Sequence, residues 1–125
     1  MTGQEVLRQA MRLLGYTDTN GEPSGSGYGE AYKQSLTVLS LVVGELSVAE
    51  TGRLCDTLKT VHEELPLSDR TARLIAPYGV AMYLAAAQGD GDHQQLFAAL
   101  YDQKRVSVRG TPEHRADRLP RGWDT

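Results

Sequence analysis

A run of residues without charge in the second half of the chain strongly limits what the chain can fold into. No Asp, Glu, Lys or Arg occurs over residues 74–87. A helix over this run is apolar on nearly every side, so other elements must surround it. Ser68 or Asp69 can cap its start, and Gly89 can adopt the left-handed conformation that ends it. We therefore expect the central helix of an all-α domain here.

A second helix is expected directly after it. Asp92 and Gln95 have the spacing of a capping box, and the two helices should run antiparallel. The buried stripe of the second helix is expected to consist of Leu96, Phe97, Leu100 and Tyr101. Pro77 lies inside the first helix, lacks an NH for the carbonyl of Arg73 and crowds that turn, so we expect a kink between these two residues.

Two more helices are predicted in the first half of the chain. One covers residues 2–14, with Thr2 and Glu5 in capping-box spacing and Gly15 just past its end. Its apolar stripe consists of Val6, Leu7, Ala10, Leu13 and Leu14. The other covers residues 30–46, and its apolar positions are Tyr32, Leu36, Val38, Leu39, Leu41, Val42, Val43 and Leu46. Because it is apolar on two sides, its excess face belongs either to the core or to a subunit interface.

The chain between these helices is predicted to be irregular. Residues 17–29 hold four glycines and Pro23. No strand precedes them and the lysine of a phosphate-binding loop is missing, which favours a flexible linker over a nucleotide site. Residues 47–65 are expected to form a connector with one or two helical turns, in which residues 47–50 can cap a short helix.

The residues that most often carry chemistry are few and scattered. Cys55 is the only cysteine, which excludes an intrachain disulfide, and its leucine neighbours favour a small buried hydrophobe over a catalytic thiol. His62, His93 and His114 have no partner at metal-ligand spacing. No nucleophile, base and orienting group can be named together, so we expect no catalytic residues, no metal, no cofactor and no enzyme.

The charge pattern bears on partners and on cellular location. The charge-free run over residues 74–87 is too short to span a bilayer. Glu5, Arg8 and Arg12 interrupt any apolar run that could serve as a signal peptide. These features predict an intracellular protein without membrane contact. The net charge is −3 with a pI near 5.5. A chain with this acidic balance is not expected to bind nucleic acid sequence-specifically.

The C-terminal segment differs from the rest. Residues 104–125 carry six Lys or Arg and three Asp or Glu, a net +3, whereas the first 103 carry seven and 13, a net −6. Residues 105–109 alternate like a short strand. We therefore divide the chain into a helical domain, residues 1–104, and an arm, residues 105–125, which is either a frayed terminus or an interface segment. The candidate interface residues are Arg105, Val106, Val108, Arg109, Arg118, Leu119, Pro120, Arg121 and Trp123.

Several segments also resemble one protein family. The runs PYGVAMYLAAAQGD (77–90) and LFAALYDQKR (96–105), with LLGYTDTNG (13–21) and LPLSD (65–69), are similar to small bacteriophage head–tail connector proteins, also called head-completion or adaptor proteins. The resemblance implies a bundle of about four main helices at the head–tail junction of a phage or prophage virion, assembled in the host cytoplasm.

The same resemblance implies the partners. The family forms a ring beneath the portal, usually twelvefold, which retains packaged DNA and joins the head to a tail or stopper protein, although isolated adaptors can be monomers. The partners would then be the portal protein and neighbouring adaptor subunits. An alternative from another class stays open, namely a small bacterial protein-binding or regulatory helical module unrelated to virions.

Overall fold

The computed structural model describes residues 1–16 and 25–109, and this part of the chain is helical, as predicted. An isolated antiparallel bridge joins Thr2 to Glu64, and no strand is formed among the described residues. None of the described helices is long and apolar enough to cross a membrane. The helices are α1 (Gly3–Leu14), α2 (Gly25–Thr51), α3 (Asp69–Leu74), α4 (Ala76–Ala87) and α5 (Gly91–Arg109).

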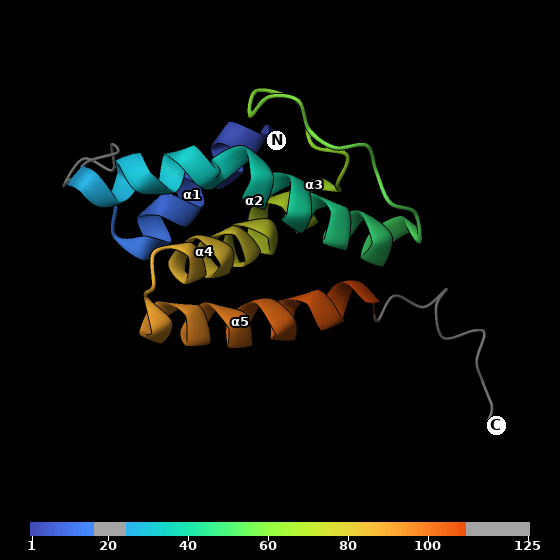
Figure 1. Ribbon diagram of the computed structural model, residues 1–125. Helices are drawn as coiled ribbons and strands as arrows, with labels where there is room; N and C mark the ends of the chain where they lie inside the picture. The colour runs from blue at the N-terminus through green and yellow to red at the C-terminus, as the bar shows by residue number, and fades with distance from the viewer. Residues whose placement is uncertain (17–24, 110–125) are drawn as a thin grey trace.

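Helix α4 forms the centre of the bundle, which confirms the expectation from the charge-free run. It packs against α1, α2 and α5, and in Figure 1 it lies between α2 and α5. It runs opposite to α5, to which a tight turn joins it (Figure 1). Ala81 and Ala85 on this helix are fully buried, so the neighbouring helices approach its backbone closely. The core therefore surrounds α4, and the surface features of the molecule lie on the outer faces of α1, α2 and α5.

Helix α1 begins and ends as the sequence predicts. The Glu5 backbone NH donates to the Thr2 hydroxyl and the Thr2 NH donates to the Glu5 carboxylate, which completes the capping box. Gly15 follows the helix with a φ of 81°. The predicted stripe is buried except for Leu13, which is 36% exposed.

The predicted single kinked helix is in fact two helices, which corrects that expectation. Ser68 caps α3 by accepting from the Thr71 NH, as predicted, and α3 ends before Ile75. Helix α4 then restarts, so that Pro77 lies in its first turn. At that position the missing NH of proline leaves no helical hydrogen bond unmade, because the first NH groups of a helix have no partner inside it. The interruption falls at Ile75, between Arg73 and Pro77, which is where the kink was expected.

Helix α2 is longer than predicted at both ends. It includes residues 25–29, which we expected in the loop, because packing of the following turns, where Ala31 and Ser35 are buried, outweighs the low helix propensity of glycine. At the other end it continues to Thr51, so residues 47–50 do not cap a separate helix. The first stop signal is Gly52, with a φ of 76°. The rest of the loop, residues 17–24, lies outside the described residues.

Helix α5 also differs from the prediction at both ends. Its cap is Asp90, whose carboxylate accepts from the His93 NH at 3.1 Å, whereas Asp92 lies within the first turn. Asp90 takes this role because it directly follows Gly89, whose φ of 74° confirms the predicted left-handed turn. Residues 105–109, predicted as a short strand, form the last turn of α5, and Val108 is buried.

Some predictions of burial also need correction. Phe97 and Tyr101 are buried and Leu100 is partly buried, but Leu96 is 52% exposed, so the stripe of α5 is narrower than expected. Cys55 packs against the core but is only partly buried, and its neighbour Leu54 is 75% exposed. Most of the apolar positions predicted for α2 are buried, but Tyr32 and Leu41 are exposed.

Candidate functional site

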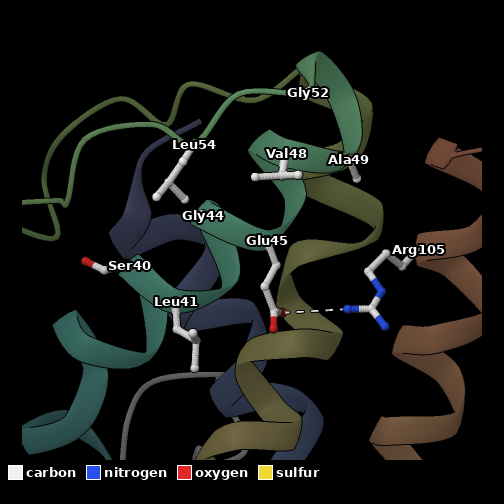
Figure 2. Close-up of a pocket in the computed structure, with 9 residues that line it drawn as sticks. All are labelled: Ser40, Leu41, Gly44, Glu45, Val48, Ala49, Gly52, Leu54 and Arg105. Carbon is white, nitrogen blue, oxygen red and sulfur yellow. Dashed lines mark ion pairs between the residues drawn. The ribbon is translucent and has the colours of Figure 1, made fainter. Parts of the chain in front are cut away.

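A groove runs along the outer face of α2. It has a volume of about 840 Å³ and is bounded by Leu54, in the chain that follows α2, and by Arg105 of α5. Figure 2 shows the α2 side chains between these two boundaries. We call this feature the apolar groove; its lining residues are Ser40, Leu41, Gly44, Glu45, Val48, Ala49, Gly52, Leu54 and Arg105.

The spacing of residues along α2 explains why the groove lies there. The lining residues are four apart in two adjacent rows, and such rows form one face of an α-helix. The opposite face, which includes Leu39, Val43 and Leu46, is fully buried. Leu41 and Val48, each 46% exposed, are large apolar side chains that the core does not use. The excess apolar face predicted for this helix is therefore divided between the core and the groove.

Glu45 is the single carboxylate among the groove residues and is held by three side chains from two other helices. Its two carboxylate oxygens accept hydrogen bonds from the hydroxyls of Tyr83 in α4 and Tyr101 in α5, each at 2.8 Å. Arg105 lies 4.0 Å from the same carboxylate, as the dashed line in Figure 2 marks. The Arg105 guanidinium also lies over the Tyr101 ring, 5.1 Å from its centroid. This network joins α2, α4 and α5 at the floor of the groove.

The electrostatics of the two tyrosines indicate what the network does. Burial, followed by the hydrogen bond to Glu45, raises the pKa of Tyr83 to about 12. The same two causes raise the pKa of Tyr101 well above its ordinary range. Both hydroxyls therefore stay protonated at neutral pH and act as hydrogen-bond donors. This arrangement fixes the relative positions of three helices rather than supplying a base or a nucleophile.

A second polar cluster lies at the C-terminal end of α2. Glu50, near the end of α2, accepts hydrogen bonds from the Ser68 hydroxyl and from the Thr71 hydroxyl at 2.6 Å, which ties α2 to the start of α3. Burial alone would raise the pKa of Glu50, but these hydrogen bonds outweigh it and lower the pKa. The chain after α2 then returns over the helix, and Leu54 packs so closely that a Cβ on Gly44 would lie 3.2 Å from it.

Four of the candidate interface residues from the sequence lie in the described part of the chain, and their surroundings differ. Arg105 lines the apolar groove, and Val106 is 63% exposed on α5. Val108 is buried, so it belongs to the core rather than to an interface, and Arg109 is the last residue of α5. The other five, Arg118, Leu119, Pro120, Arg121 and Trp123, lie outside the described residues.

Glu45 and Tyr83 are not among the candidate residues predicted from the sequence, although Glu45 carries a signal there. It is the only charged residue between Lys33 and Glu50. A lone carboxylate in an apolar helix must be paired, because an unpaired buried charge is costly. Its partners could not be identified in this way, since Tyr83 and Tyr101 are 38 and 56 residues away along the chain.

Neither the described residues nor the comparisons point to a known type of site. Over residues 1–16 and 25–109, no group of three or more His, Cys, Asp or Glu side chains is placed to hold a metal ion. Comparison of the chain with protein-family models, with curated proteins and with solved structures finds no match. The geometry of the apolar groove is therefore the main basis for a functional proposal.

Proposed function

We propose that this chain is a structural adaptor of a phage or prophage virion, which assembles as a ring beneath the portal and joins the head to the tail. The observation that carries the proposal is the apolar groove, because Leu41, Val48 and Leu54 are large apolar side chains left exposed next to one another. Contiguous exposed apolar surface of this kind marks protein–protein contact sites. The resemblance of residues 77–90 and 96–105 to head–tail connectors supplies the type of partner.

Ring assembly requires that one face of a subunit bind a different face of the next subunit. The apolar groove suits one half of such a contact. Ala49 has a small side chain that lets a neighbouring chain approach α2, while Leu41 and Val48 supply apolar area. The Glu45 network keeps α2, α4 and α5 in fixed positions, so little conformational freedom is lost on binding.

The C-terminal segment has a separate part in this proposal, which comes from its sequence. Trp123 is the only tryptophan in the chain, and Arg118 and Arg121 shortly precede it in the sequence. Tryptophan and arginine are the residues most enriched among those that dominate binding energy at interfaces. We assign residues 110–125 to contacts with the portal or with the neighbouring subunit, so that the groove and this segment act in the same assembly.

The experiment that tests the proposal compares two charge insertions at positions of similar exposure. Leu41→Glu places a carboxylate in the groove, whereas Leu96→Glu places one on an exposed part of α5 that does not line it. Each protein is mixed with the portal encoded beside its gene, and complex formation is measured by mass photometry. We expect Leu41→Glu to lose the complex and Leu96→Glu to keep it. If both variants assemble like the wild type, the groove is not an assembly contact.

Gene neighbourhood tests the virion assignment independently of the groove. An adaptor gene is expected next to genes for a portal, a protease and a major capsid protein. A locus without any of these would contradict the adaptor proposal and would favour a bacterial helical module that uses the same groove for another protein.

A further inference from the structure

A second, smaller groove differs from the apolar groove in its charge. It has a volume of about 310 Å³ and lies where α1, α3, α4 and α5 meet. Its lining includes Arg12 and Leu13 of α1, Arg73 and Leu74 of α3, Tyr78 of α4 and Lys104 of α5, and none of its lining residues is acidic. We call it the basic groove. Three cations from three different helices therefore surround one small space.

The cations are positioned by their helices and remain accessible. Lys104 lies with its ammonium group 4.6 Å from the centroid of the Tyr78 ring, which holds it at the wall of the groove. Arg73 pairs with Asp69 at 3.5 Å, but the two side chains are 57% and 71% exposed, so water weakens this pair. Arg12 is exposed in the last turn of α1. The guanidinium and ammonium groups can thus meet an incoming anion.

The basic groove also presents apolar surface. Leu13 is 36% exposed and Leu74 is 52% exposed, and both line the groove beside the cations. A ligand that matches this surface carries carboxylates and an apolar side chain close together. Nucleic acid fits less well, because three cations neutralise few phosphates, the apolar walls would face a polar backbone, and the chain as a whole carries −3.

We propose that the basic groove binds an acidic peptide segment of a protein partner in which a leucine-like side chain lies between carboxylates. The carboxylates pair with Arg12 and Lys104, and the apolar side chain packs between Leu13 and Leu74. This inference does not depend on the virion assignment, because it follows from the charge and shape of the groove alone. It also gives the molecule a second binding face, which shares no lining residue with the apolar groove.

The probe for this site is a short fluorescein-labelled peptide of glutamates with two central leucines, and binding is followed by fluorescence anisotropy. The test variant combines Arg12→Glu with Lys104→Glu. Its matched control combines Lys33→Glu with Lys59→Glu, which changes the net charge equally at exposed positions outside the groove. We expect the groove variant to bind about tenfold more weakly and the control to bind nearly as well as the wild type.

Further measurements separate the parts of the proposal. Replacing the two leucines of the peptide by serines should also weaken binding, and so should Leu74→Ser in the protein. Far-UV circular dichroism checks folding, and Arg12→Gln alone, at an exposed position, replaces the double variant if that variant unfolds. Equal losses in the groove and control variants, or no binding of the peptide by the wild type, would overturn the proposal. Tighter binding of a single-stranded oligonucleotide of equal charge would also overturn it and would assign the groove to nucleic acid.

Discussion

Replacing Gly79 by alanine tests how closely α4 and α5 pack beneath the apolar groove. A Cβ at this position would lie 2.7 Å from Cε1 and 2.8 Å from Cζ of Tyr101. Carbon atoms in ordinary contact are about 3.5–4.0 Å apart, so the ring would have to move by about 0.8 Å or more. Tyr101 is only 1% exposed and its hydroxyl is bonded to Glu45, so the ring has little room to move.

The magnitude follows from two opposing effects. Alanine is favoured over glycine inside a helix by about 0.5–1 kcal/mol. Forcing an extra methyl group into a well-packed core costs about 1–3 kcal/mol, and movement of Tyr101 also weakens its hydrogen bond to Glu45. We therefore expect Gly79→Ala to lower the free energy of unfolding by about 1–2 kcal/mol, which corresponds to a fall of about 3–8 °C in Tm.

The assay is thermal and urea unfolding of Gly79→Ala, followed by circular dichroism, with two comparisons. Gly29→Ala is the control, because a Cβ at this helical position meets nothing within 4 Å, and it should be neutral or slightly stabilising. In a Tyr101→Leu background the cost of Gly79→Ala should largely disappear, since the clashing ring is gone. If Gly79→Ala is as stable as the wild type, α4 and α5 do not pack as closely as described.

Three further predictions concern the core, the polar cluster at Glu50 and the C-terminal segment. Ala81→Leu, at a fully buried position of α4, should lower the free energy of unfolding by about 1–3 kcal/mol in a thermal melt. The pKa of Glu50 in the folded chain is lower than its ordinary value of 4.5. The Glu50 carboxylate therefore stabilises the fold above pH 4.5, and this stabilisation is lost as the pH falls through the lower pKa of the folded chain. Glu50→Gln should therefore be less stable than the wild type at neutral pH and lose less stability on acidification, as measured by urea melts. If the stability of the variant and of the wild type depends on pH in the same way, the hydrogen bonds of Glu50 do not stabilise the fold as described. Deleting residues 110–125 should leave Tm nearly unchanged, because Val108 and the rest of α5 are retained. The same deletion should abolish incorporation into particles. A truncated protein that unfolds, or that still completes heads, would refute the proposed interface role of this segment.

The helix ends that could be predicted are those with a local signal in the sequence. The Thr2 and Glu5 capping box, the Ser68 cap and the left-handed Gly15 and Gly89 depend on a few neighbouring residues, so their spacing was sufficient. The central position of α4 was also predictable, because an apolar helix without charges must be surrounded.

Features that depend on distant contacts could not be predicted in this way. The start of α2 within a glycine-rich stretch is stabilised by the packing of later turns. The alternation of residues 105–109 suggested a strand, although Val108 continues the buried stripe of Phe97 and Tyr101 at helical spacing. The apolar groove needs Leu54 and Arg105 to approach α2 from opposite sides, and neither approach is visible in the local sequence.

The most direct test of the adaptor proposal is electron microscopy of the full chain mixed with the portal encoded beside its gene. The proposal predicts a ring of this protein seated on the portal with the portal's symmetry, and it predicts that Leu41→Glu abolishes the ring while Leu96→Glu leaves it intact. Portal rings that stay bare in the presence of folded wild-type protein would contradict the proposal.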